Sequence, residues 1–108
     1  MKKIILNRFE DSLFNFSLVK DDDFMGRITI YPHKEGRGKL HCHIEEKWRG
    51  KWLSKSFAKF LYQTLMLVSK EYKLEQIVTR LDNPKSLRLV DFFGFCRYNE
   101  RYYYLLVR

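Results

Sequence analysis

The sequence is poor in the residues that define several common protein classes. Its 108 residues contain two cysteines, Cys42 and Cys96, which lie far apart and form no CxxC pair. This spacing argues against a disulfide framework, and we expect both to be reduced core thiols in a cytoplasmic protein. Prolines number two and glycines five, and no repeat or low-complexity tract is present. The chain therefore has no visible linker, and we expect residues 1–108 to form a single domain.

Long hydrophobic runs are also absent. The opening MKKIIL has the basic start and apolar stretch of a signal peptide, but the stretch ends at Asn7 and Arg8. It is shorter than a signal peptide or a membrane-spanning helix requires. The sequence therefore predicts no membrane partner.

What the chain has in excess is positive charge and aromatic side chains. Lysine and arginine number 21 against 13 acidic residues, which gives a net charge of +8 and an isoelectric point near 9.6. An apolar content of 45% with 17% aromatics excludes a disordered tail. The charge favours an anionic partner, namely a nucleic acid, a nucleotide-type cofactor or an acidic protein surface, although a basic surface also serves solubility.

The first part of the chain reads as strands. Ser12–Val19 and Met25–Pro32 flank the turn sequence DDD and predict an antiparallel hairpin. A third strand is expected at Lys39–Glu45, after a glycine-containing loop. Its side chains alternate between two faces. Leu40, Cys42 and Ile44 share one face, and His41, His43 and Glu45 share the other.

The second part adds helices. Apolar residues recur at helical spacing from Trp52 to about Glu71, and the β-branched segment Glu75–Leu81 predicts a buried strand. A second helix is bounded by Asn83 as N-cap, Pro84 as first residue and Gly94 as C-terminal cap.

Residues 95–108 predict a closing hairpin that turns at Asn99 and Glu100. The order β-β-β-α-β-α-β-β requires at least one parallel pair with a right-handed crossover. We therefore predict an α/β fold with a mixed central sheet of about six strands and two principal helices.

A basic turn, Arg49-Gly50-Lys51, joins the third strand to the long helix. The first turn of a helix has unpaired N–H groups and the positive end of the helix dipole, so such a turn suits a pyrophosphate. Taken alone, the same pattern also fits an ordinary strand-to-helix turn with basic side chains.

Two motifs at fixed places carry a resemblance. RGKWLS occupies the place of an Arg/Gln-x-x-Gly-x-Gly/Ala signature, and NPKSLRLVDFFGF matches a second motif with Asn83, then Ser86, a helix and Gly94-Phe95. From Lys39 to its C-terminus the chain resembles the GNAT superfamily, the N-acetyltransferases that use acetyl-CoA. The resemblance implies a GNAT-like fold with a shortened N-terminal region, and transfer of an acetyl group from acetyl-CoA to an amine.

The resemblance also implies where acetyl-CoA binds. The backbone around Ile44 and Glu46 would receive the pantetheine arm, because the family's strand splays open there. Backbone amides of the turn would bind the pyrophosphate, and Asn83 and Ser86 would lie on the other side of the pantetheine. The implied cofactor-binding residues are Ile44, Glu46, Arg49, Gly50, Lys51, Trp52, Leu53, Ser54, Asn83 and Ser86. Further candidates, for the phosphorylated adenosine end, are Lys51, Lys55 and Lys85.

The cofactor hypothesis makes a simple prediction about two basic residues. Replacing Arg49 in the turn by glutamate is expected to weaken CoA binding. The same change at Lys2 is expected to leave it unaltered.

Two residues depart from the family pattern. Trp52 stands at the first signature glycine, where a pyrophosphate approaches the backbone closely, so its indole must turn aside, for example against the adenine. Val90 stands where family members often have a tyrosine that protonates the leaving thiolate. Tyr98, Tyr102, Tyr103 or Tyr104 would have to replace it, or else serve only in packing.

The tryptophan-leucine step is similar to that of small bacteriophage-type members of the family. In that case the location would be the host cytoplasm.

The N-terminal region suggests an open acceptor site. The family's usual first strand and two helices, which wall the acceptor, are missing or much shortened in Met1–Lys20. An open groove suits a protein or peptide amine. Glu45 and His43 are the candidate bases for its deprotonation, or else ordinary surface residues. His41 and His43 lack further ligands for zinc, so no metal is expected.

Two other classes of function remain open. The basic charge and the aromatic segment RYNERYYY would also suit nucleic-acid binding. A GNAT-like scaffold that has lost its chemistry and binds a protein partner would account for Trp52 and Val90.

Overall fold

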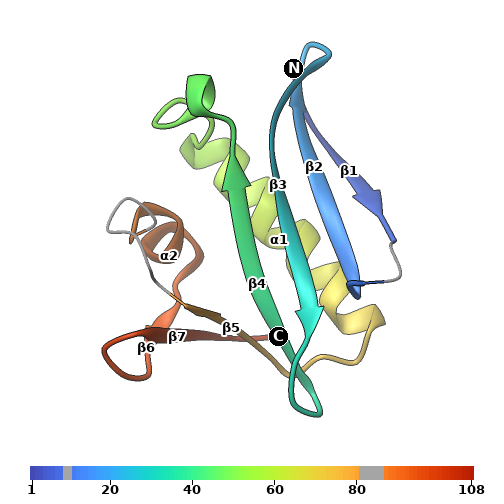
Figure 1. Cartoon of the computed structure of the whole chain (residues 1–108), viewed down its shortest axis with the longest axis vertical. Helices are drawn as coiled ribbons and strands as arrows, with labels where there is room; N and C mark the ends of the chain where they lie inside the picture. Colours follow the sequence, from blue (N-terminus) through green and yellow to red (C-terminus); the bar gives the residue numbers. More distant parts are fainter. Residues whose placement is uncertain (9–10, 81–86) are drawn as a thin grey trace.

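The computed structural model describes residues 1–8, 11–80 and 87–108 (Figure 1). Its seven strands form one sheet in the order β1-β2-β3-β4-β5-β7-β6. The elements are β1 (Lys2–Asn7), β2 (Phe14–Lys20), β3 (Asp23–Pro32), β4 (Arg37–Ile44), the short 3-10 helix η1 (Glu46–Trp48), α1 (Lys55–Glu71), β5 (Gln76–Arg80), α2 (Leu87–Phe93), β6 (Cys96–Arg97) and β7 (Tyr102–Leu106). The predicted mixed α/β fold is confirmed.

The sheet has one strand more than the six that the sequence predicted, because the N-terminal segment forms β1. This strand pairs with β2 antiparallel, from Lys2 opposite Lys20 to Asn7 opposite Asn15. Ile4 packs against the core, whereas Ile5 is exposed. Between β1 and β2, the residues that the structure describes form no helix. The short N-terminal region expected from the resemblance is thus a hairpin.

The β2–β3 hairpin is confirmed and has a tight turn. Asp21 and Asp22 both have positive φ, at 49° and 68°. A two-residue turn of this kind requires positive φ at both positions and matches the twist of the strands it joins. Aspartate tolerates this conformation better than most residues.

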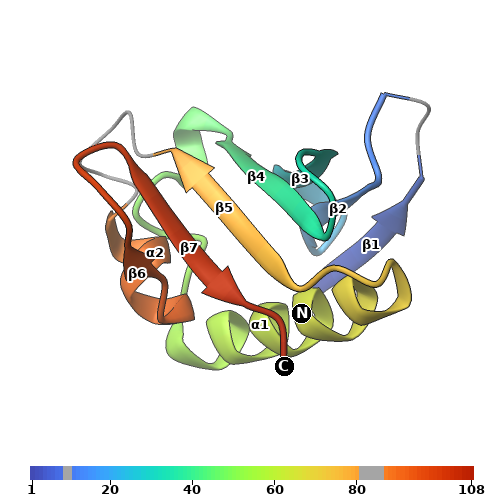
Figure 2. The same ribbon diagram turned by 90° about the horizontal axis from the view of Figure 1, so that it is seen from below.

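Helices α1 and α2 lie on one face of the sheet, below it in Figure 2, and no α-helix of the described residues lies on the other face. Helix α1 packs on the sheet through Leu61 and Leu65, which are fully buried. Burying an aliphatic side chain of this size contributes about 1.5–3 kcal/mol. The sheet's side of this core includes Phe14, Phe16, Leu18, Ile28 and Ile30.

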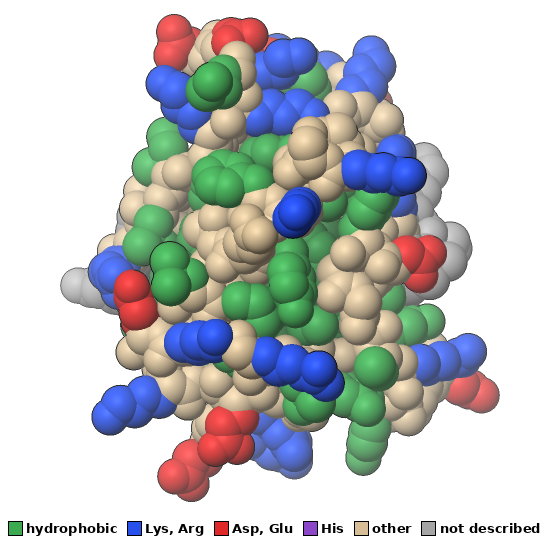
Figure 3. Space-filling view, turned by 180° about the vertical axis from the view of Figure 1, so that it is seen from behind, with side chains coloured by type: hydrophobic (Ala, Val, Ile, Leu, Met, Phe, Trp, Pro, Cys, Tyr) green, Lys and Arg blue, Asp and Glu red, His purple; other side chains and the backbone are tan. Residues whose placement is uncertain are grey.

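The side of the molecule opposite the view of Figure 1 is partly apolar. Phe60 and Leu67 of α1 are exposed. Figure 3 shows apolar side chains in the middle of this side, with lysine and arginine side chains around them. No helix that the structure describes is both long and apolar enough to cross a membrane.

Helix α1 starts three residues later than its periodicity suggested. Ser54 is its N-cap, and the Ser54 hydroxyl accepts a hydrogen bond of 3.2 Å from the N–H of Phe57. Trp52 and Leu53 are buried before the helix begins, which extended the apolar pattern upstream.

The C-terminal turns are also as predicted. Gly94 ends α2 with φ of 76°, and the N–H of Phe95 donates to the carbonyl of Val90. The Asn99 side chain accepts from the N–H groups of Arg101 and Tyr102 in the closing hairpin. The predicted helix start at Asn83 and Pro84 lies outside the described residues.

Both cysteines are free. Cys42 packs against the core from β4. Cys96 is exposed, so the prediction of a core thiol is wrong there. The reason is its position, because β6 is a two-residue strand at the edge of the sheet.

Candidate functional site

The sheet opens between β4 and β5. These strands form the predicted parallel pair, from Arg37 opposite Gln76 to Leu40 opposite Thr79. Beyond Leu40, β4 continues to Ile44, and among the described residues it pairs there with β3 alone. Figure 1 shows β4 and β5 diverging toward their C-terminal ends. Within the described ranges, no residue pairs with the β5-facing edge of β4 beyond Leu40, so this edge can accept an extended ligand.

The last paired position is fixed by a side chain. The Thr79 hydroxyl donates a hydrogen bond of 3.2 Å to the carbonyl oxygen of Leu40, and Thr79 is buried. A buried hydroxyl with its partner in place holds the two strands together where they are about to part.

The turn between β4 and α1 uses some of its amides internally. The N–H of Arg49 donates to Glu46, and the N–H groups of Lys51 and Trp52 both donate to the carbonyl of Trp48, at 3.0 and 3.1 Å. Three of the six amides from Arg49 to Ser54 that were predicted to bind a pyrophosphate thus already have acceptors.

Other amides at this place have none. In the described part of the chain, no protein acceptor is found for the N–H groups of Gly50, Leu53, Ser54, Lys55 and Ser56. Gly50 has φ of +78°, and a Cβ built on it would meet no atom within 4 Å. Unpaired N–H groups of the turn and of the first turn of α1, at the positive end of the helix dipole, suit an anion.

Trp52, which stands where the family signature has a glycine, directs its side chain into the core. Its side chain is only 8% exposed and packs edge-on against Phe57, with ring centroids 6.4 Å apart. The indole does turn aside, but into the core and not toward an adenine. Burial of so large an apolar ring outweighs any surface contact.

The turn is held at one end by β1. The Lys2 ammonium donates a hydrogen bond of 2.9 Å to the Trp52 carbonyl and lies over the Phe57 ring, 5.3 Å from its centroid. Burial, and then the charge of Lys20, lower the pKa of Lys2. Lys2 therefore lies at the turn. It cannot serve as the distant control residue for CoA binding that the sequence suggested.

The other end of the turn is held by the β2–β3 hairpin. The Asp23 carboxylate accepts from the Lys47 ammonium at 2.7 Å and from the Trp48 indole N–H at 3.1 Å. The hydrogen bond from Lys47 is the main reason that the pKa of Asp23 lies below its ordinary value. No local sequence signal points to Lys2 or Asp23, because they act across 50 and 25 residues of chain.

The two predicted bases lie side by side at the end of β4. The Nε2 of His43 is 3.9 Å from a carboxylate oxygen of Glu45, and both side chains are about half exposed, at 57% and 46%. They are on the face of the sheet without helices, where the alternation of β4 also places His41.

A hollow of about 340 Å³ lies on that face, where β4 and β5 separate. Sequence reasoning placed His41 on the correct face but did not select it. The lining residues are Tyr31, Lys39, Leu40, His41 and Arg80.

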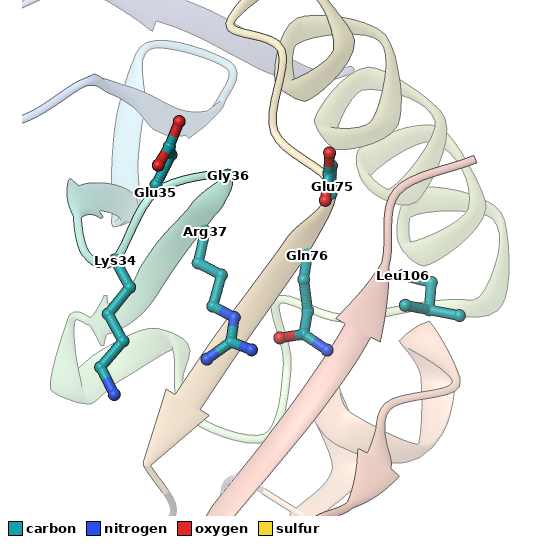
Figure 4. Close-up of a pocket in the computed structure, with 7 residues that line it drawn as sticks. All are labelled: Lys34, Glu35, Gly36, Arg37, Glu75, Gln76 and Leu106. Carbon is teal, nitrogen blue, oxygen red and sulfur yellow. The ribbon is translucent and has the colours of Figure 1, made fainter.

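A second hollow, of about 520 Å³, lies at the other end of β4 (Figure 4). Lys34 and Arg37 line it together with Glu35 and Glu75. The N–H of Glu75 donates to Gly36 at 2.7 Å, so this hollow belongs to the contact between the β3–β4 loop and the start of β5. It lies away from the opening between the strands and mixes both signs of charge.

The position of the family's usual tyrosine is part of the core. Val90 is 4% exposed on α2 and has no proton to donate. Of the four substitutes, Tyr98 is 75% exposed, whereas Tyr102 and Tyr103 pair with Arg80 and Thr79 at the end of β5. The β5–β7 ladder thus places these two tyrosines on the far side of β5 from the opening, level with the last β4–β5 pair.

The described residues give no support for Cys42 as a covalent acyl carrier or for a metal centre. Burial raises the pKa of Cys42 to about 12, which keeps it a thiol and a poor nucleophile. Within the described ranges, no three His, Cys, Asp or Glu side chains are grouped so that they could hold a metal ion. Asn83, Lys85 and Ser86 lie outside those ranges.

Comparison with solved structures identifies the fold. An acetyltransferase of the GNAT family from Bacillus anthracis matches with a TM-score of 0.67 at 19% identity, over 85% of this chain and 65% of that one. Spermidine N-acetyltransferase from Vibrio cholerae, in complex with CoA and spermine, matches with a TM-score of 0.66 at 17% identity, over 87% and 65%.

The N-acetyltransferase PseH from Campylobacter jejuni, in complex with acetyl coenzyme A, matches with a TM-score of 0.63 at 16% identity, over 88% and 68%. No protein-family model and no curated protein sequence matches the chain. The chain thus has the GNAT fold and spans about two thirds of the length of these structures.

Proposed function

We propose that residues 1–108 form an N-acetyltransferase domain that transfers an acetyl group from acetyl-CoA to an amine. One observation carries the proposal: the β4–β5 pairing ends at Leu40 and Thr79, and β4 leads through η1 and the turn to a capped helix with unsatisfied N–H groups. Structural neighbours with the same fold were crystallised with acetyl coenzyme A or CoA.

The donor set at the turn fits the cofactor. The N–H groups of Gly50, Leu53 and Ser54, with those of Lys55 and Ser56, would hold the pyrophosphate oxygens at the positive end of α1. The free edge of β4 near Ile44 would pair with the amides of the pantetheine arm.

The remaining implied cofactor residues keep the roles that the resemblance gives them. Glu46 lies at the start of η1, beside the proposed path of the pantetheine. Asn83 and Ser86 would lie on the other side of that path. Arg49, Lys51 and Lys55 would add positive charge around the phosphates.

The protein's part in the reaction is positioning and proton transfer. Acetyl-CoA supplies a thioester, whose acetyl group the amine accepts as the C–S bond breaks. Glu45 or His43, or a water molecule, would take the proton that the amine loses, and Tyr102 or Tyr103 would return one to the departing sulfur. Holding amine and thioester together would supply much of the rate.

The acceptor we propose is a protein or peptide amine, since in the described part of the chain no α-helix on that face of the sheet encloses a small substrate at the opening. Both cysteines are free, and we place the enzyme in the cytoplasm. Kinship with bacteriophage-type members rests on the Trp52-Leu53 step alone.

Position 55 offers a sharp test of the backbone donors. Proline is well tolerated at the first position of a helix, and Ser54 already has the extended backbone (φ −104°, ψ 165°) that a residue before proline prefers. Lys55→Pro therefore removes an N–H and a charge, whereas Lys55→Ala removes only the charge. We expect calorimetry to show CoA binding at least about tenfold weaker in Lys55→Pro than in Lys55→Ala, because a hydrogen bond to a charged group contributes about 1.5–3 kcal/mol.

Equal CoA affinities of Lys55→Pro and Lys55→Ala would show that the α1 N-terminus is not part of the cofactor site. Lys34→Glu, at the far end of β4, serves as the charge control in place of Lys2. Turnover is then tested by incubating the protein with labelled acetyl-CoA and a host lysate and measuring the label transferred to any acceptor. CoA binding without any labelled acceptor would favour the non-catalytic scaffold.

A further inference from the structure

The sheet face without helices carries a compact group of basic side chains. Figure 1 is viewed from this face, and it is the upper face in Figure 2. Lys39, His41 and Arg80 come from two strands and line the same hollow, together with Tyr31. Arg27 extends the group on β3, where it pairs with His43.

The hollow lies at the opening of the sheet. Leu40 and Thr79 are the last β4–β5 pair, so His41 and Arg80 are the first residues beyond it. The turn leads from β4 to α1 on the opposite face of the sheet. An acceptor that approaches from the helix-free face would therefore meet these side chains just before it reaches the opening.

Negative charge is scarce on this face. The only acidic residue in any described strand is Asp23, which is bound to Lys47 and Trp48. Other carboxylates lie at the two ends of the face, Glu45 beyond β4 and Glu75 before β5. From Lys39 to His43, β4 spans only about 13 Å, at about 3.3 Å per strand residue.

We propose that the acceptor is an acidic peptide segment, with a carboxylate near its reactive amine that binds Lys39 in this hollow. The inference rests on the proposed acetyl transfer and names its substrate class. A polyamine would be repelled by the cations. A nucleic acid would need a longer basic track for its phosphates, and the carboxylates at both ends interrupt one.

Lys39 is the residue to test. Arg80 already has a partner within the chain, so it is left unaltered. Lys3 is an exposed lysine on β1, at the far edge of the same sheet, and gives a control with the same change of charge.

The first measurement is peptide binding without CoA, by fluorescence anisotropy. The probe is a labelled ten-residue peptide with one central lysine flanked by aspartate and glutamate residues. A matched neutral peptide has asparagine in place of each aspartate and glutamine in place of each glutamate. We expect the acidic peptide to bind at least tenfold more tightly than its match. Lys39→Glu should abolish this preference, and Lys3→Glu should keep it.

Two results would overturn the inference. One is equal binding of the two peptides to the wild-type protein. The other is tighter binding of a single-stranded oligonucleotide of the same charge, if that binding is lost in Lys39→Glu, because it would assign the face to nucleic acid.

A second measurement separates this inference from the proposed function. Calorimetry with CoA should give the same affinity for wild-type protein and Lys39→Glu. If CoA binds and acetylation proceeds equally on both peptides, the inference fails and the proposed function stands. If the acidic peptide binds selectively but CoA does not bind, the proposed function fails and the peptide site stands.

Discussion

Lys2 and Trp52 are separated by 50 residues in the chain and joined by a hydrogen bond of 2.9 Å between the Lys2 ammonium and the Trp52 carbonyl. The bond ties the N-terminal strand to the turn that leads into α1. Because the same turn presents the free amides of Gly50, Leu53 and Ser54, β1 supports the candidate cofactor site without reaching the ligand.

Loss of this bond should loosen the turn. Lys2→Met keeps the apolar stem but removes the donor and the cation over Phe57. A net hydrogen bond of about 0.5–1.5 kcal/mol and a cation–π contact of about 0.5–1 kcal/mol add to about 1–2.5 kcal/mol, and because burial disfavours the charged ammonium, as its lowered pKa shows, we expect a loss of about 1 kcal/mol. Urea unfolding measures it, with the exposed Lys3→Met as control. An unaltered midpoint in Lys2→Met would show that the contact contributes nothing.

Restoring the family's glycine at position 52 should harm the protein. Trp52→Gly removes a buried indole and leaves a cavity against Phe57, so we expect a loss of about 3–5 kcal/mol, the range for large-to-small core changes. CoA affinity should not improve, since the indole does not cover the free amides. Trp52→Phe should retain more of the stability. A Trp52→Gly variant that is as stable as the wild type and binds CoA more tightly would contradict this account.

The N-cap of α1 is a third test. Ser54→Ala removes the oxygen that accepts from the Phe57 N–H and should destabilise the protein by about 1 kcal/mol. Ser54→Asp should retain the cap. Ser56→Ala removes a hydroxyl that lies 3.4 Å from the Ser54 hydroxyl but accepts no hydrogen bond from a backbone N–H, so it should cost less stability than Ser54→Ala. A loss as large in Ser56→Ala as in Ser54→Ala would argue against the cap.

The anchor at Asp23 should depend on pH. The fold lowers the pKa of Asp23 from its ordinary value of 3.8, so it favours the charged form. Its contribution is complete above that value and is lost as the pH falls through the lower pKa of the folded state.

The indole N–H resonance of Trp48 should therefore move as the pH drops below 3.8, and that of Trp52 should not. In Asp23→Asn the Trp48 resonance should no longer follow this titration. Identical curves for the variant and the wild type would exclude Asp23 as the titrating group.

Much of the fold could be predicted because its signals are local. The paired aspartates at 21 and 22 mark a hairpin turn, and Gly94 marks the end of α2. The β5 segment follows β4 and a helix, and a strand–helix–strand unit returns the chain to the sheet in the same direction. The parallel pairing of β4 and β5 could therefore be predicted. Strand β1 was missed because six residues of mixed pattern do not distinguish a strand from a leader.

The site could be predicted only in outline. The turn was predicted from its basic, glycine-containing sequence. Which of its N–H groups remain free could not be predicted, because the N–H groups of Lys51 and Trp52 both donate to the carbonyl of Trp48. The direction of the Trp52 indole depends on Phe57 and the core, and the hollow at His41 depends on where β4 and β5 part. These are tertiary relationships, and no local pattern encodes them.

An amide chemical-shift map during titration with CoA tests residue by residue whether CoA binds along the opening and the α1 N-terminus. We expect saturable shifts at Gly50, Leu53, Ser54, Lys55 and Ser56 and along β4 beyond Leu40. Little change is expected around Lys34 and Glu75, in the hollow at the other end of β4. No saturable shifts at millimolar CoA, or shifts confined to that other hollow, would contradict CoA binding at the opening and the α1 N-terminus.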